Sequence, residues 1–256
     1  VSPMVPASVK IKRRQGLPRV RKVHQLVGAG PPDVFGVHNN SLSNLVRGVV
    51  ERIFLVDYGK GLQPPIRPSS AGFRTGVRTA EKFMRANAFL VSKFTVGQFL
   101  ACYKGDARKV RRYEEANRSL SLTPLEDKDA HIQTFIKAEK CNFSAKEDPA
   151  PRVISPRSPR YNLELGLFIK PLEGVIYKLL NRMCGGVTVM KGLNAVQVGE
   201  AIESAWTSFS DPVAVGCDAK RFDQHTGVEA LKYEQRIYSL FYAGGDKEDL
   251  QSLLKH

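Results

Sequence analysis

The sequence lacks the features of several common protein classes. No run of 18 consecutive apolar residues occurs, so no transmembrane helix is expected. The first residues contain no apolar signal core and carry Pro, Lys and Arg instead. The four cysteines form no Cys-x-x-Cys pair and have no histidine at zinc-finger spacing, which argues against structural zinc. We expect them to be buried free thiols of a protein from a reducing compartment.

Acidic residues are scarce over most of the chain. Its 256 residues include 39 Lys and Arg against 25 Asp and Glu, a net charge of +14. A charge of this size favours a polyanionic partner. The balance reverses at the end, where residues 192–256 hold six basic and ten acidic groups. This reversal indicates two tasks, in which one part of the chain binds phosphate backbone and the other binds metal ions. For any single cluster, ordinary solvated surface charge is the favoured interpretation.

The remaining composition is that of a globular protein, with 42% apolar and 25% charged residues. Helical spacing of apolar residues predicts a core helix over 41–58, helices within 77–101, a helix opened by Pro171, and an amphipathic helix over 195–209 with Trp206 in the core. Short strands are predicted at 132–137, 151–156 and 213–217, the last of them buried. Because the chain begins at Val1 and ends within an apparently helical segment, we expect it to be an excerpt.

The segment Val213 to His225 is the most informative for chemistry. Its apolar start predicts a strand that delivers Asp218 at its end, and Asp223 follows after four intervening residues. Hard divalent cations prefer carboxylate oxygens, and phosphoryl transfer uses two such ions. The alternative is a loop with two surface aspartates, one of which caps the next helix.

A second segment gathers cations on the two short strands before Pro159. Lys137, Lys140, Lys146 and Arg152 could bind a triphosphate, with Glu139 orienting one of them. Nucleic-acid backbone could be contacted by two sets of residues: Arg157 and Arg160, and the basic stretch Arg108, Lys109, Arg111 and Arg112. The alternative is a basic hairpin with ordinary surface charges.

Both segments resemble the RNA-dependent RNA polymerases of positive-strand RNA viruses, closest to the tombusvirus family. The sequence KAEK…PRVISPRSPRYNLELG…KPLE resembles that family's motif F, and GCDAKRFDQH resembles its motif A. The resemblance implies that Asp218 coordinates both catalytic Mg²⁺ ions (Mn²⁺ being an alternative) and that Asp223 senses the ribose 2′-OH of the incoming nucleotide. It also implies that Lys137, Lys140 and Arg152 hold the triphosphate. Motif B and the Gly-Asp-Asp of motif C do not occur in this chain, so we expect it to be inactive alone.

The predicted fold is α+β, a right-hand nucleic-acid polymerase with fingers and an incomplete palm. We expect a basic N-terminal arm at 1–40, fingers at 41–210 with motif F at about 132–162, and the start of the palm at 211–256 with motif A at 213–225. The implied partners are template RNA, the nascent strand, NTPs and other viral replication proteins. The implied location is the host cytoplasm, in a membrane-associated replication complex.

Two alternatives from other classes stay open at this point. A non-catalytic basic RNA-binding replication factor would use the basic stretches and ignore Asp218. A carboxylate-metal nuclease would need further acidic or histidine ligands, and the sequence offers no convincing set. Substitution of Asp218 separates the polymerase from the binding factor.

Overall fold

The computed structural model describes Arg21 and residues 33–67, 69–219 and 221–255. The chain forms two compact units, each built from three sequence segments. We call 1–67, 131–157 and 220–227 the hairpin unit, and 68–130, 158–219 and 228–256 the helical unit. The predicted basic arm lies largely outside the described residues. None of the described helices is both long enough and apolar enough to cross a membrane.

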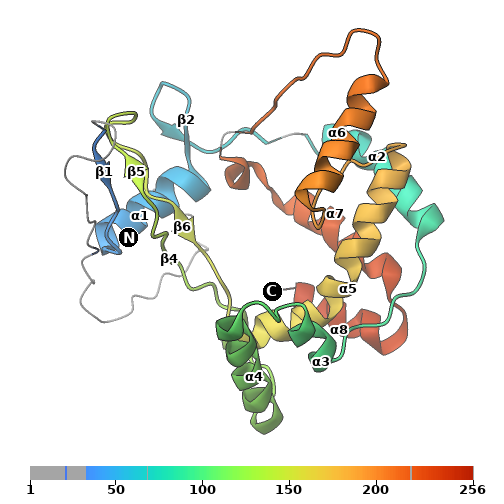
Figure 1. The fold of residues 1–256 in the computed structure, drawn as a ribbon. Helices are drawn as coiled ribbons and strands as arrows, with labels where there is room; N and C mark the ends of the chain where they lie inside the picture. The colour runs from blue at the N-terminus through green and yellow to red at the C-terminus, as the bar shows by residue number, and fades with distance from the viewer. Residues whose placement is uncertain (1–20, 22–32, 68, 220, 256) are drawn as a thin grey trace. The chain divides into compact units, whose positions relative to one another are not determined.

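The hairpin unit is built on one helix and three strand pairs. Helix α1 (Leu42–Val49) begins after Ser41, whose side chain accepts a hydrogen bond from the Asn44 amide, and it continues as the π-helical turn η1 (Val50–Phe54). The antiparallel pairs are β1 (Phe35–Gly36) with β5 (Cys141–Asn142), β2 (Val56–Asp57) with β3 (Leu62–Gln63), and β4 (Phe135–Ile136) with β6 (Val153–Ile154) (Figure 1). The short 3-10 helix η3 (Phe222–His225) completes the unit.

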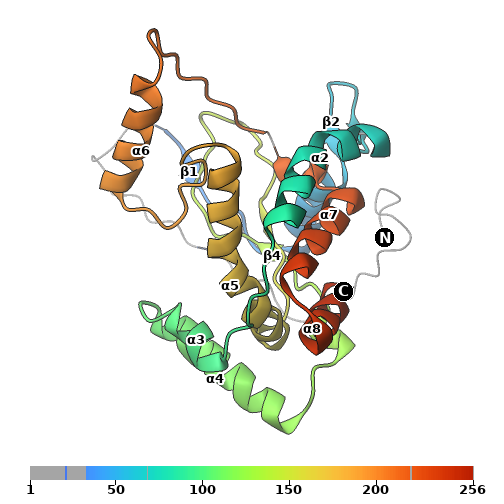
Figure 2. The ribbon, with the colours of Figure 1, turned by 90° about the vertical axis from the view of Figure 1, so that its right-hand side faces the viewer.

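The helical unit is organised around α5 (Pro159–Met183). Its other elements are α2 (Ser70–Asn87), α3 (Val96–Ala101), α4 (Ala107–Leu122), η2 (Asp127–Ala130), α6 (Ala195–Thr207), α7 (Val228–Tyr238), η4 (Ser239–Phe241) and α8 (Gly244–Leu254). Helices α2 and α7 lie side by side and contribute to the main core with α5 (Figure 2). That core includes the fully buried Leu172, Phe241 and Leu250. A second core joins Phe99 of α3, Ala116 of α4 and Leu163 of α5.

The helix after the second basic strand begins earlier than predicted. Pro171 does not open it but lies inside α5, whose first residue is Pro159. The Ser158 side chain accepts from the Tyr161 amide, and a proline at the first helical position needs no amide partner. The capped start at Ser158 therefore outcompetes the later proline as the beginning of the helix.

The predictions before residue 160 hold better than those after 190. The helix in 41–58 and the strands in 132–137 and 151–156 are confirmed. The buried strand at 213–217 is wrong: the segment has no regular structure, and Val213 and Val215 are 79% and 80% exposed. Within the described residues no other strand pairs with it, so its backbone groups have no ladder to join. Helix α6 forms as predicted, but it buries none of its residues, and Trp206 is half exposed rather than in the core.

The cysteine prediction is half right. All four thiols are free, yet Cys102, Cys184 and Cys217 are exposed and Cys141 is half-buried. The assignment of segments to fingers and palm stays a prediction, because the two units group residues by packing and cut across both assignments.

Candidate functional site

Two predicted cations of the hairpin unit converge on one carboxylate. Lys137 Nζ lies 2.9 Å and Arg152 Nη1 lies 3.2 Å from the same oxygen, Glu139 Oε2. The strand pair brings them together, because the Lys137 amide donates to the Arg152 carbonyl at 2.9 Å. Burial raises the pKa of Glu139, but the two cations outweigh this and leave the pKa below its ordinary value. Glu139 thus stays ionised and holds both cations in place.

Arg52 adds a third cation that the sequence analysis missed. It is half-buried in η1, and its Nη1 donates to the Ala150 carbonyl at 3.3 Å. Burial is the main cause that lowers the pKa of Arg52, and the positive charges of Arg152 and Arg221 lower it further. Positive charges this close together favour the binding of an anion among them. The only signal in the sequence is that Arg52 is one of two arginines within the largely apolar stretch 45–55, which alone would not mark a site.

Asp223 is held in this unit by the residues on either side of it. Arg221 adopts a left-handed backbone (φ 54°, ψ 49°), and its Nη1 donates to the Glu51 carbonyl at 2.7 Å. Gln224 is buried, and its Nε2 donates to the carbonyls of Glu51 (2.8 Å) and Leu55. Asp223 itself is exposed between these anchors, and its charge acts on Arg52. The sequence analysis gave Gln224 no role; the structure makes it the anchor of the Asp223 segment.

Asp218 lies in the exposed irregular segment before residue 220 and belongs to the helical unit. Among the described residues, no group of three His, Cys, Asp or Glu side chains comes together that could hold a metal ion. The described residues therefore do not by themselves fit a bound metal at Asp218. Lys140 is also exposed and forms no ion pair within the described residues.

The residues predicted to contact RNA fall into different surroundings. The four α4 cations are all exposed: Arg108, Lys109, Arg111 and Arg112. Lys109 also lies 5.5 Å from the centre of the Tyr103 ring. Arg157 is half-buried. Arg160 instead donates to the side chains of Asp129 and Ser119, contacts that test no RNA-binding role but give its guanidinium a structural one.

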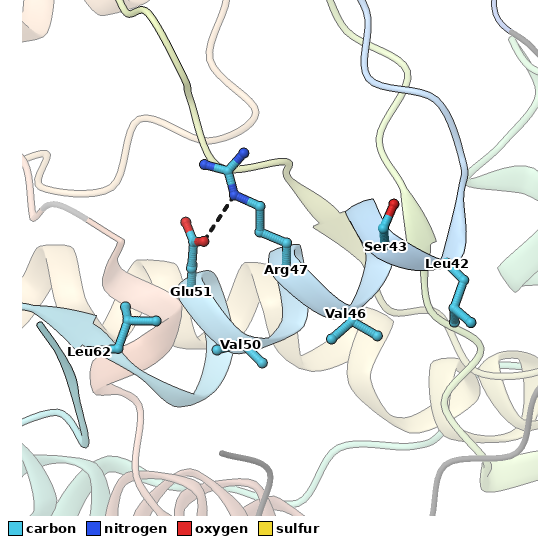
Figure 3. Close-up of a pocket in the computed structure, with 7 residues that line it drawn as sticks. All are labelled: Leu42, Ser43, Val46, Arg47, Val50, Glu51 and Leu62. Carbon is cyan, nitrogen blue, oxygen red and sulfur yellow. Dashed lines mark hydrogen bonds and ion pairs between the residues drawn. The ribbon is translucent and has the colours of Figure 1, made fainter. Parts of the chain in front are cut away.

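A shallow groove runs along α1 on the hairpin unit (Figure 3). Leu42, Val46, Val50 and Leu62 form its apolar floor. Arg47 and Glu51 are joined at 2.9 Å on the other side of the helix in this view. None of the cations around Glu139 lines the groove, so this cation cluster is a separate feature of the unit.

Comparison with known proteins gives a consistent result. The family described as viral RNA dependent RNA polymerase matches residues 9–256. The chain is 39% identical over 249 residues to the RNA-directed RNA polymerase of Tobacco necrosis virus (strain D), covering 97% of the chain and 34% of that protein. It is 46% identical over 240 residues to the polymerase of strain A, covering 93% of the chain and 32% of that protein. The corresponding protein of Turnip crinkle virus is 42% identical over 240 residues, covering 93% of the chain and 30% of that protein. The chain thus spans about a third of the length of these relatives, and no solved structure matches it.

Proposed function

The chain belongs to the viral RNA-dependent RNA polymerase family, and on that premise we propose that it supplies the nucleotide-entry part of an RNA-directed RNA polymerase. The observation that carries this proposal is the convergence of Lys137 and Arg152 on Glu139, with Arg52 beside them. A fixed set of cations suits a triphosphate, whose charges need several positive partners at once. In the right-hand fold that we propose for the longer protein, this part would belong to the fingers.

The chemistry of the complete enzyme would be attack of an RNA 3′-OH on the α-phosphate of an NTP, with release of pyrophosphate. Lys137, Lys140 and Arg152 would bind the triphosphate and stabilise the negative charge that grows on the leaving group. Asp223, held by Arg221 and Gln224, would accept a hydrogen bond from the ribose 2′-OH, which distinguishes RNA from DNA.

We propose Asp218 as one ligand of Mg²⁺ in the longer protein. The described residues bring no group of three metal-ligating side chains together, so metal binding would require further ligands beyond them. The polymerase motifs B and C are missing from the sequence, and we therefore propose that the chain alone does not synthesise RNA. Its partners would be template RNA, the nascent strand, NTPs and other viral replication proteins, in a membrane-associated complex of the host cytoplasm.

The decisive experiment uses the full-length polymerase that carries this chain. Asp218→Ala should abolish RNA synthesis and leave RNA affinity unchanged, since an exposed carboxylate does not attract RNA. Asp211→Ala is the matched control, because Asp211 is exposed in the same irregular stretch. Synthesis by the Asp218→Ala enzyme at the rate of the control would refute the catalytic role.

The nucleotide role has its own test. Arg152→Ala should raise the KM for NTPs about tenfold, the effect of losing one charge-assisted contact. Lys60→Ala is the control, because Lys60 is an exposed cation on the turn between β2 and β3. Equal KM values for the two variants would place the triphosphate elsewhere.

A second function is favoured by one observation, the exposed cations of α4. A non-catalytic RNA-binding replication factor would depend on these residues and not on Asp218. Full RNA binding by a full-length protein that synthesises no RNA, whatever residue stands at position 218, would favour this second function.

A further inference from the structure

Asp129 is the most buried acidic side chain of the described residues, with 5% of its surface exposed. It lies in η2, and its carboxylate accepts three hydrogen bonds, from the Glu126 amide (3.1 Å), Ser158 Oγ (3.0 Å) and Arg160 Nε (3.1 Å). Burial raises its pKa, but these donors outweigh burial and leave the pKa below its ordinary value. The proposed function uses neither this carboxylate nor its partners.

Arg160 is occupied on every side of its guanidinium. Besides the bond to Asp129, its Nη1 donates to Ser119 Oγ at 2.6 Å, and its Nη2 donates to the carbonyls of Thr123 (2.8 Å) and Pro124 (2.7 Å). The planar fork of arginine allows these simultaneous contacts, and lysine could not reproduce them. The pair therefore ties η2 and the end of α4 to the first turn of α5.

Helices η2 and α5 flank the segment 131–157 of the hairpin unit in the sequence. The chain leaves the helical unit after η2 and returns to it at the start of α5. The Ser158 amide donates to the Asp129 carbonyl at 3.1 Å, so the two ends are joined through backbone as well. We call the joined residues Asp129, Ser158 and Arg160 the base clamp. When the ends of this 27-residue segment are already joined, the entropic cost of closing the loop does not have to be met again as the strands pair.

From the base clamp the strands pair in one register up to the cations. The Gln133 amide donates to the Pro156 carbonyl at 2.8 Å, Phe135 pairs with Ile154, and the Lys137 amide donates to the Arg152 carbonyl at 2.9 Å. The register matters because a slip by one residue would move every side chain of one strand to the opposite face. Such a slip would separate Arg152 from Lys137 and Glu139, which lie two residues apart on the opposite segment.

We propose that Asp129 and Arg160 are positioning residues for nucleotide binding: the base clamp sets the register of β4 and β6 and thereby holds Lys137 and Arg152 together on Glu139. This inference rests on the proposed function for the site itself. It gives Arg160 a role through the hairpin rather than through direct contact with RNA.

The first test needs only the present chain. In Asp129→Asn, hydrogen exchange at the Gln133 and Lys137 amides should become at least about tenfold faster, because a buried charged acceptor is lost. Asp127→Asn, a change at an exposed carboxylate of the same η2, should leave both rates unchanged. Arg160→Lys, which keeps the charge and removes the fork, is the milder variant if Asp129→Asn does not fold, and it should accelerate the same two amides. Unchanged exchange in a folded variant would overturn the proposal.

The second test measures NTP kinetics in the full-length polymerase. Asp129→Asn should raise the KM for NTPs about tenfold and change kcat by less than about threefold, since the reacting groups are untouched. A normal KM together with accelerated exchange would overturn the positioning role while leaving the site itself in place. A normal KM in Lys137→Ala and Arg152→Ala would instead refute the proposed function. Loss of RNA affinity in Arg160→Lys with unchanged exchange would return Arg160 to direct RNA contact and refute the clamp.

Discussion

Replacing Gly48 by alanine should disturb the proposed nucleotide site by pushing on the segment that carries Arg152. Gly48 is buried in α1, and a Cβ built on it would lie 2.7 Å from Val153 Cγ1 and 2.8 Å from the Pro151 carbonyl oxygen. Pro151 is fully buried and its oxygen belongs to the backbone, so the contact cannot be relieved by turning a side chain. The segment must therefore shift, and Arg152 lies between the two residues that are pushed.

The expected free-energy change combines two opposing terms. Overpacking a filled interior costs about 1–3 kcal/mol, and alanine in place of glycine in a helix returns about 0.5–1 kcal/mol. Gly48→Ala should therefore lower the free energy of unfolding by about 0–2.5 kcal/mol, where Gly76→Ala raises it. Gly76→Ala in α2 is the matched control: its Cβ would meet nothing within 4 Å, so the change should stabilise by about 0.5–1 kcal/mol.

Urea unfolding of the two variants measures this difference at constant m-value. In the full-length polymerase, Gly48→Ala should also raise the KM for NTPs by about threefold to tenfold, because a small displacement of Arg152 misaligns a binding cation. Gly76→Ala should leave KM unchanged. Equal stabilisation by both substitutions would show that the space beside Gly48 is not filled as described, and the reasoning would fail.

Three further outcomes are expected. Gln224→Ala should destabilise the chain by about 1–3 kcal/mol in urea unfolding, because two backbone carbonyls lose their donor, while His225→Ala at the exposed neighbour should change little. The folded-state pKa of Glu139 is depressed below its ordinary value of 4.5. The stability that ionised Glu139 contributes is therefore present above pH 4.5 and is lost as the pH falls through the lower folded-state pKa. The difference in unfolding free energy between wild type and Glu139→Gln should close over that acidic range. Glutamine at all four α4 cations should flatten the dependence of log K for single-stranded RNA on log[salt] by about 0.7 per lost phosphate contact, and an unchanged slope in a binding titration would move the RNA surface elsewhere.

The sequence predicted the strands of the hairpin better than the segment from Val213 to Cys217, and the difference has a physical reason. Strands β4 and β6 pair with each other, so the residues that decide their structure lie within one short stretch of chain. The apolar run from Val213 to Cys217 has β-forming composition, but a strand also needs a neighbour, and composition does not reveal whether one exists. The prediction that Trp206 lies in the core was wrong for a similar reason. An amphipathic pattern identifies an apolar face without showing that anything covers it.

The residues missed at the candidate site share another property. Arg52 and Gln224 act through contacts with distant parts of the chain, and the spacing of nearby residues does not predict such contacts. Arg160 shows the converse, because a basic residue in a basic motif suggested a surface contact and the structure pairs it with a buried aspartate. Sequence patterns therefore predicted a chemistry, while long-range packing decided which of the predicted side chains come together.

The interleaving of the two units also affects synthesis on the ribosome. Gln224 donates to the Glu51 carbonyl across 173 positions, so α1 and η1 are made long before the residue that completes their end. At a translation rate of about 5–20 residues per second, this interval lasts on the order of ten to thirty seconds. Throughout it the carbonyls of Glu51 and Leu55 lack their Gln224 donor, and the hairpin unit can reach its final form only after η3 has emerged.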